Sequence, residues 1–188
     1  MRNLIILSFV FILSFLNTPQ LQAQERVEGV DVPATIQSKS SENLELLGVG
    51  VRTKFFFDLY VCSLFVPDRS KDISAIIESD TSITVRLNII SGMITAEKMY
   101  AAMADGFDLS SPDPDEVLQE KIDAFQSLFK ANSIEEGDQF QFSYSKDFGT
   151  IVTKNNKELA SIPGLDFKKS LFNIWLGPKP VDKGLKKN

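Results

Sequence analysis

The sequence predicts an α+β fold in which an antiparallel β-sheet is covered on one face by a layer of helices. Short apolar runs follow one another at hairpin spacing in two parts of the chain, which is typical of antiparallel strands. Three longer segments carry apolar side chains at helical spacing and therefore need an apolar surface to cover. Of the 188 residues, 43% are hydrophobic and 24% are charged, a composition that indicates one ordinary globular domain.

Residues 1–23 are predicted to be a signal peptide, followed by a single domain at 24–188. Arg2 precedes a run of 13 residues without a charge, and "LQA" stands before Gln24 where a signal peptidase would cut. The alternative is a membrane anchor, but the run is shorter than the ~20 residues that a spanning helix needs. We therefore expect a bacterial protein that is exported, periplasmic or secreted, with no stable membrane span after cleavage.

The first half of the domain is predicted to be mainly strands. Residues 29–36 form an edge strand at best, since Pro33 has no N–H to donate to a neighbour. Residues 44–54 and 55–66 are rich in β-branched and aromatic side chains, and they predict a hairpin that turns near Lys54–Phe55.

A short helix and a further strand are predicted to follow this hairpin. Asp72 is placed to cap a helix over residues 71–79. Residues 82–90 alternate apolar and polar side chains, as a half-buried strand does.

Two amphipathic helices come next. The first spans residues 95–107, with Thr95 as its N-cap and its end near Gly106. The second spans residues 113–132, with Asp113 as its predicted N-cap.

The last part of the domain is predicted to return to the sheet and to end in a helix. Three strands are expected at residues 137–145, 149–154 and 157–162. Residues 163–180 carry an apolar face at helical spacing, Gly177 and Pro178 are expected to end the helix, and the basic tail that follows is expected to be exposed.

Composition excludes several classes of function. The sequence contains no histidine, so Ser-His-Asp and Cys-His catalysis and the usual zinc and haem ligands are excluded. Cys62 is the single cysteine and is expected to be a buried, inert thiol. The net charge of −5 argues against nucleic acid and disfavours an anionic membrane surface. We expect neither a cofactor nor a metal.

Arg52 lies inside an apolar strand without an evident partner beside it. A guanidinium keeps its charge, and burying it alone is costly. In the predicted hairpin, Arg52 lies opposite Phe57, with Tyr60 ~10 Å further along the strand. The guanidinium fork and the tyrosine hydroxyl suit a carboxylate with an apolar tail. The alternative is that Arg52 simply faces solvent.

Three segments of the sequence resemble a known family. They are "LLGVGVRTKFFFDLYVCSLFVP", "ITAEKMYAAMADGF" and "DFKKSLFNIWLGPKPVDKGLKK". All three are similar to blocks of the chalcone isomerase-fold family, in particular its bacterial chalcone isomerase-like branch, and the resemblance covers about residues 28–187. It implies an antiparallel sheet with a helical layer and a ligand cleft between them.

The resemblance also implies roles for individual positions. The plant isomerases close a chalcone to a flavanone with an arginine, a threonine, a tyrosine and an asparagine. Their arginine matches Arg52, but the other three positions fall on Tyr60, on Met99 beside Tyr100, and near Gly106. The fatty-acid-binding members keep the arginine and have a tyrosine in place of the threonine, and both hold the carboxylate.

Together with the predicted signal peptide, the resemblance therefore implies a non-catalytic, exported binding protein for a fatty acid or a similar apolar carboxylate, held by Arg52 and Tyr60. The alternative is an isomerase (intramolecular lyase) of the chalcone isomerase type, acting on a phenolic substrate. A third possibility is an interaction protein with a closed core and no ligand cavity.

Overall fold

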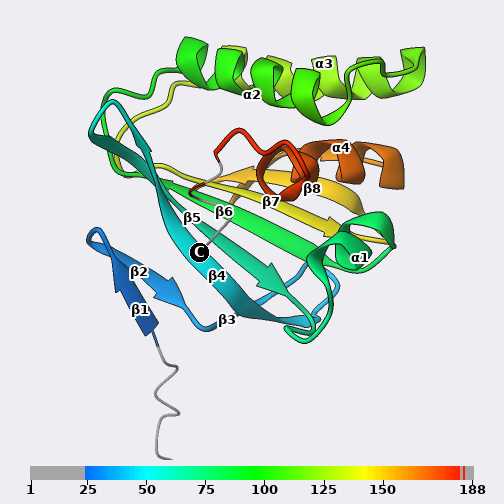
Figure 1. Cartoon of the computed structure of the whole chain (residues 1–188), viewed down its shortest axis with the longest axis horizontal. Helices are drawn as coiled ribbons and strands as arrows, with labels where there is room; N and C mark the ends of the chain where they lie inside the picture. The colour runs from blue at the N-terminus through cyan, green and yellow to red at the C-terminus, as the bar shows by residue number, and fades with distance from the viewer. Residues whose placement is uncertain (1–23, 183, 185–188) are drawn as a thin grey trace, which may run out of the picture.

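The fold is built around a curled antiparallel sheet of seven strands, in which each strand pairs with the next one along the chain (Figure 1). It was obtained as a computed structural model that describes residues 24–182 and 184. The strands of this sheet are β3 (Thr35–Gln37), β4 (Asn43–Lys54), β5 (Phe57–Val66), β6 (Ile83–Ile89), β7 (Gln139–Ser145), β8 (Gly149–Lys154) and β9 (Lys157–Ile162). The predicted signal peptide lies outside the described residues.

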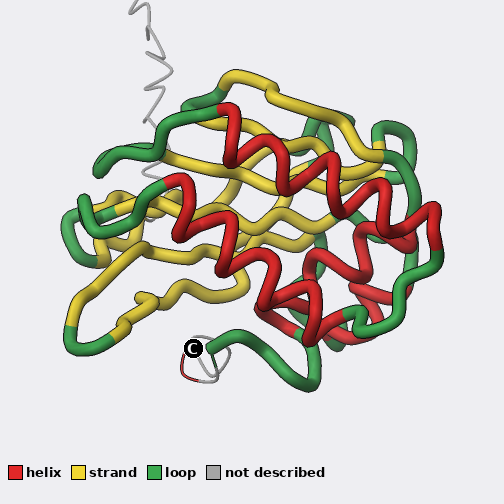
Figure 2. Tube along the Cα trace, turned by 90° about the horizontal axis from the view of Figure 1, so that it is seen from above, coloured by secondary structure: helices red, strands yellow, loops and turns green. Residues whose placement is uncertain are grey.

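Helices cover one face of the sheet, as the sequence predicts. The four helices are α1 (Ile73–Glu78), α2 (Ala96–Ser110), α3 (Glu116–Ala131) and α4 (Leu165–Leu176). Seen from above, α2 and α3 run side by side over the strands (Figure 2). Among the described residues, no helix has the length and apolar character needed to cross a bilayer. The α+β architecture expected from the pattern is therefore confirmed.

The main core lies between the helices and the sheet and is rich in phenylalanine. Phe125 of α3 packs its ring within 5.3–5.7 Å of the rings of Phe107, Phe129, Phe142 and Phe167, measured between centroids. These contacts join three helices to strand β7, which lies next to the central strand β6. Phe125 and Phe129 lie four residues apart, so both face the core from α3, as expected for the amphipathic helix predicted here.

The opposite face of the sheet has a small core of its own. It is covered by the hairpin of β1 (Gln24–Val27) and β2 (Val30–Pro33). Val32 of that hairpin is buried in one cluster with Leu44, Val61 and Phe65. The sequence suggested only an edge strand here, because a four-residue strand carries too short a pattern to show which face it covers.

Two helix ends differ from the prediction. Helix α2 continues through Gly106 to Ser110. A Cβ atom at position 106 would lie 2.7 Å from Ile174, so glycine at this position lets α2 and α4 approach closely. Helix α3 is capped by Asp115 rather than Asp113, and the Asp115 carboxylate accepts a hydrogen bond of 2.8 Å from the N–H of Leu118.

The β4–β5 hairpin turns one residue later than predicted, and this changes its register. The turn residues are Phe55 and Phe56, and Lys54 pairs with Phe57. An extra residue on β5, Leu59, then shifts the pairing between the two strands. As a result, the predicted pairing of Arg52 with Phe57 is wrong.

The true partner of Arg52 across the hairpin is Tyr60. Directly opposed residues of an antiparallel pair project from the same face of the sheet, with Cβ atoms ~4.5–5.5 Å apart. The predicted separation of ~10 Å along the strand therefore does not exist. The two side chains proposed to share a ligand are neighbours.

Candidate ligand-binding site

A cavity of about 530 Å³ lies between the β4–β5 hairpin and α2. This volume falls within the ~300–1,000 Å³ that is usual for small-molecule sites. Its apolar lining includes Leu59, Ile94, Met99, Ala102 and Val181. The half-buried Arg52 and the buried Tyr60 supply polar groups to the lining. The cavity meets solvent at three exposed charged residues, Lys54, Lys98 and Asp105. The cavity disfavours the possibility of a closed core.

Arg52 points into this cavity and is largely withdrawn from solvent. Its side chain is 15% exposed. The Nη1 atom is buried and has no hydrogen-bond partner within the described part of the chain. The carboxylate of Asp182 lies 3.8 Å from Nη1, which is within reach of charge attraction but too long for a hydrogen bond. The structure thus excludes the alternative that Arg52 simply faces solvent.

Tyr60 lies beside Arg52 and is 6% exposed. The guanidinium carbon of Arg52 is 6.0 Å from the centroid of the tyrosine ring. Burial raises the pKa of Tyr60 to about 12, although the positive charge of Arg52 acts in the opposite direction. Tyr60 is therefore a neutral phenol at physiological pH and retains its proton for donation.

Trp175 of α4 holds the Tyr60 hydroxyl in place. Its indole N–H donates a hydrogen bond of 3.3 Å to the hydroxyl oxygen, and its ring stacks on Phe142 with centroids 5.6 Å apart. The sequence pattern places Trp175 only on the apolar face of the last helix. A buried tryptophan usually finds an acceptor for its N–H, and that rule was the available signal.

Comparison with known proteins agrees with this architecture. The sequence profile of the chalcone isomerase-like family matches residues 24–188. The chain belongs to the chalcone isomerase-like family. Among curated proteins, no sequence is significantly similar to it. Among solved structures, the chain is similar to the crystal structure of the Arabidopsis thaliana fatty-acid binding protein AtFAP1, with a TM-score of 0.68 and 18% identity over 88% of this chain and 94% of that chain.

The positions that correspond to the polar groups of the plant isomerases of this family are scattered. Met99 is buried and lines the cavity. Tyr100 lies outside the lining, with Lys130 Nζ 4.1 Å from its ring centroid. Gly106 packs against Ile174. The cavity of this chalcone isomerase-like protein thus combines Arg52 and Tyr60 with an apolar side chain, Met99, at the position that the sequence resemblance matches to a tyrosine of the plant isomerases.

The segment after α4 contributes to the site, which the sequence pattern does not predict. We expected an exposed tail, and for Val181 and Asp182 this is wrong. The N–H of Val181 donates a hydrogen bond of 2.9 Å to the carbonyl of Ile174, which folds the chain back against α4. Val181 lines the cavity, and the Asp182 side chain is only 20% exposed beside Arg52.

Cys62 lies on the same strand as Tyr60 and takes no part in the cavity lining. It is buried, and burial raises the pKa of its thiol to about 12. The expectation of a buried thiol with little thiolate character is confirmed.

Proposed function

We propose that this protein is a non-catalytic binding protein for a fatty acid or a similar apolar carboxylate. The observation that carries the proposal is a buried guanidinium nitrogen, Arg52 Nη1, that has no hydrogen-bond partner in the described part of the chain and borders an apolar cavity. A buried charge needs a counter-charge and hydrogen bonds. The Asp182 carboxylate, 3.8 Å from Nη1, supplies a counter-charge but no hydrogen bond, and a ligand carboxylate would supply the missing hydrogen bonds.

The geometry suggests how each part of such a ligand is held. The carboxylate would lie between the guanidinium of Arg52 and the hydroxyl of Tyr60, which project from neighbouring strands. The alkyl chain would run along the apolar lining, which includes Leu59 and Met99. Charge-assisted hydrogen bonds would fix the head group, and burial of the methylene groups would supply much of the affinity. The likeness to a structure described as a fatty-acid binding protein supports this assignment.

Catalysis of chalcone cyclisation is the second candidate function, and the residues of the site disfavour it. Met99 cannot donate a hydrogen bond, and Gly106 lies against Ile174 rather than in the cavity. Without such donors, an enolate developing in the transition state would lack stabilisation. We expect a chalcone incubated with the protein to cyclise only at the spontaneous rate. Stereoselective flavanone formation at an enzyme-like rate would favour the isomerase.

The test of ligand binding compares Arg52→Ala with a matched arginine variant. Loss of a charge-assisted hydrogen-bonded pair of ~1.5–3 kcal/mol corresponds to roughly ten- to a hundredfold weaker binding. Palmitate and laurate should therefore bind Arg52→Ala more weakly by this factor in calorimetric titrations. Arg69→Ala removes an exposed arginine and should leave the affinity unchanged. Equal affinity of wild type and Arg52→Ala would overturn the assignment of Arg52.

The ligand class itself can be identified from protein purified from its source. Native mass spectrometry should detect a co-purified species with the mass of a fatty acid or related carboxylate. Arg52→Ala purified in the same way should carry less of it.

We further propose that the protein is exported to the periplasm after cleavage before Gln24. The apolar run that follows Arg2 supports this, and the family match begins at residue 24. N-terminal sequencing of the protein from its source should find Gln24, within a residue or two. An intact Met1 on membrane-bound protein would contradict export by cleavage.

A further inference from the structure

Two hairpins of the same sheet use the same tight turn with different residues. The β8–β9 turn consists of Asn155 and Asn156, with φ values of 50° and 64°. The β4–β5 turn consists of Phe55 and Phe56, with φ values of 50° and 69°. A two-residue turn with both φ values positive favours Asn, Asp and Gly.

Folding explains the asparagine turn. The Asn155 side-chain oxygen accepts a hydrogen bond of 2.8 Å from the N–H of Gln139, and its amide donates one of 2.7 Å to Asp138. Asparagine also tolerates the left-handed backbone well. Residues 155–156 are thus well suited to the turn they make.

Folding does not explain the phenylalanine turn. A bulky side chain at positive φ is strained. Phe55 is 80% exposed and Phe56 102% exposed, and Phe57 beside them is 54% exposed. These rings gain little from burial in the folded chain, so their placement at a strained turn indicates an external partner.

Further apolar side chains surround the same place. Met93 is 44% exposed and Leu109 46% exposed, and both line the ligand cavity together with Phe55. Five of the seven large exposed hydrophobic side chains in the described part of the chain therefore gather at this end of the molecule. We call residues 55–57, Met93 and Leu109 the apolar rim of the cavity mouth.

Positive charge lies directly behind the rim. Lys54 Nζ is 5.8 Å from the centroid of the Phe55 ring. Lys98, whose Nζ donates a hydrogen bond of 2.8 Å to the carbonyl of Met93, also lines the cavity. Among the charged side chains that line the cavity, Arg52, Lys54 and Lys98 outnumber Asp105, so the lining is net positive although the whole chain is acidic. Aromatic rings with lysines behind them fit a membrane interface, where the rings enter the acyl boundary and the ammonium groups meet lipid phosphates.

We propose that the apolar rim docks the protein on the surface of a phospholipid bilayer. Figure 1 shows the β4–β5 hairpin reaching the margin of the molecule, beside the loop that leads into α2. The three phenylalanine rings, which are the most exposed part of the rim, would bury at most ~450–750 Å², less than the ~800 Å² per partner of a typical stable protein interface. A bilayer accepts a projecting tip of this size because it needs no surface of complementary shape.

Docking in this position would turn the mouth of the cavity towards the lipid. If the proposed function is correct, an apolar carboxylate could then pass between bilayer and cavity without crossing water. The docking itself does not require a fatty acid, so its test and the test of the proposed function can fail separately.

The test uses unliganded wild-type protein, Phe56→Gly and Phe148→Gly with sedimenting vesicles of phosphatidylcholine and phosphatidylglycerol. Phe148 is a matched control, since it is a turn phenylalanine, 41% exposed, with Lys39 Nζ 5.5 Å from its ring centroid. We expect wild type and Phe148→Gly to partition alike and Phe56→Gly to partition about tenfold less. Because glycine relaxes the positive φ, Phe56→Gly should unfold at the same or a higher temperature than wild type.

A depth measurement strengthens the test. The indole of Phe56→Trp should be quenched by lipids brominated on their acyl chains, whereas quenching in Phe148→Trp should not exceed the background from buried Trp175. Three results would overturn the proposal: wild type that does not bind the vesicles, Phe56→Gly that binds as well as wild type, or self-association without vesicles that Phe56→Gly abolishes. The last would identify a second copy of the chain as the partner of the rim.

Discussion

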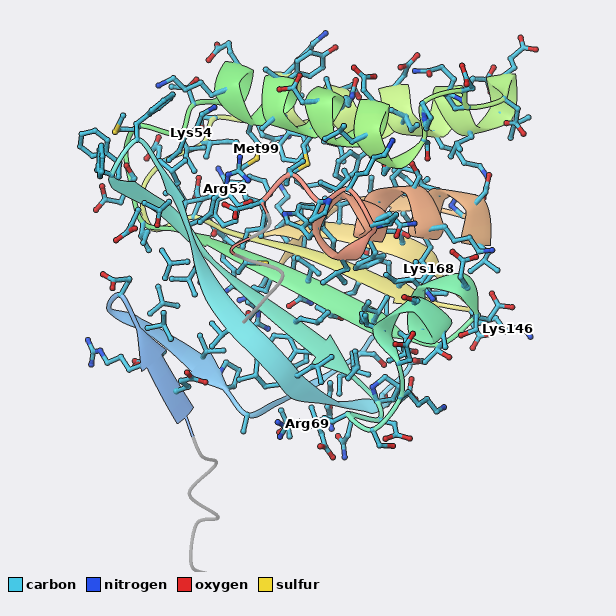
Figure 3. All side chains as sticks on the ribbon, viewed as in Figure 1. Arg52, Lys54, Arg69, Met99, Lys146 and Lys168 are labelled. Carbon is cyan, nitrogen blue, oxygen red and sulfur yellow. The ribbon has the colours of Figure 1, made fainter. Side chains whose placement is uncertain are left out.

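Two cations are withdrawn from solvent in different parts of the molecule, and their hydrogen bonds differ. Lys168 of α4 is 0% exposed. Its ammonium group donates hydrogen bonds of 2.6 Å to the carbonyl of Ile76 and 2.9 Å to that of Thr81, and a third to Ser79. Arg52, in contrast, has a buried nitrogen without a hydrogen bond in the described structure. Figure 3 shows the two residues well apart, with Arg52 near Met99 and Lys168 near α1.

The difference shows which of the two buried charges is structural. All three N–H groups of Lys168 are used, and they bind carbonyl groups at the end of α1 and in the turn after it. A six-residue helix is too short to be stable alone, and its last carbonyls lack partners within the helix. Lys168 therefore fixes α1 to α4. The hydrogen-bonding capacity of Arg52 is incompletely used, so Arg52 retains capacity for a ligand.

The largest effect should come from Lys168→Met. This substitution leaves three carbonyl groups without their buried donor, and each unsatisfied group costs about 1–3 kcal/mol. We expect the free energy of unfolding to fall by about 3–5 kcal/mol in urea titrations. Arg52→Met is the matched control, and its free energy of unfolding should hold or rise, because an incompletely satisfied charge is replaced by an apolar side chain. If Arg52→Met lost as much stability as Lys168→Met, Arg52 would also be a structural charge, and the proposed difference between the two residues would be wrong.

The second prediction concerns Asp182, whose carboxylate lies 3.8 Å from Arg52 Nη1. This resident carboxylate competes with a ligand carboxylate for the same charge. Asp182→Asn should therefore bind palmitate more tightly, by up to about tenfold for ~1.4 kcal/mol of relieved competition. Asp105→Asn also removes one negative charge from the cavity lining and controls for general repulsion. The same gain in both variants would show that Asp182 has no special position.

The third prediction uses pH. Burial lowers the pKa of Lys168 to about 8, whereas an unfolded lysine titrates near 10.4. Between these values the unfolded chain holds the proton that the folded chain has lost, so stability rises with pH. Burial raises the pKa of Cys62 to about 12, which has the opposite effect, since only the unfolded thiol ionises above ~8.5.

The two contributions can be separated by substitution. In Cys62→Ala, the free energy of unfolding should rise by about 0.5–1 kcal/mol between pH 7.5 and 8.5. The free energy of unfolding of the wild-type protein should rise by about half as much over the same interval. A flat profile in Cys62→Ala would mean that Lys168 keeps an ordinary pKa in the folded chain.

Most of the fold was predictable because its signals are local. Apolar alternation in β6 and the helical stripe of α3 depend on neighbouring residues only, and both elements lie where the pattern predicts. The buried state of Cys62 followed from its apolar strand in the same way. Lys168 was not recognised, because its acceptors lie 87–92 positions earlier in the chain.

The candidate site was predictable only in part. Arg52 and Tyr60 were found from a charge in an apolar run and from the family resemblance. The direct pairing of Arg52 with Tyr60 was not predicted, because it depends on an extra residue at Leu59 and on a turn without glycine. Trp175 and Asp182 reach the site through the folding of α4 and the segment after it, and no pattern in the sequence reports such long-range contacts.

The smallest effect on ligand affinity is expected for Tyr60→Phe, which tests how much of the site is shared between Arg52 and its neighbour. The ring and its packing remain, and only the hydroxyl is lost. One neutral donor to a carboxylate is worth less than the guanidinium, so palmitate affinity should fall about two- to fivefold, or ~0.4–1 kcal/mol. The indole N–H of Trp175 also loses its acceptor, so the free energy of unfolding should fall by about 1 kcal/mol.

Because the pKa of Tyr60 is raised to about 12, the affinity ratio between wild type and Tyr60→Phe should stay constant from pH 6 to pH 9. A ratio that changes within this range would show that a different group donates to the carboxylate. An unchanged affinity, together with the loss in Arg52→Ala, would assign the anchor to Arg52 alone.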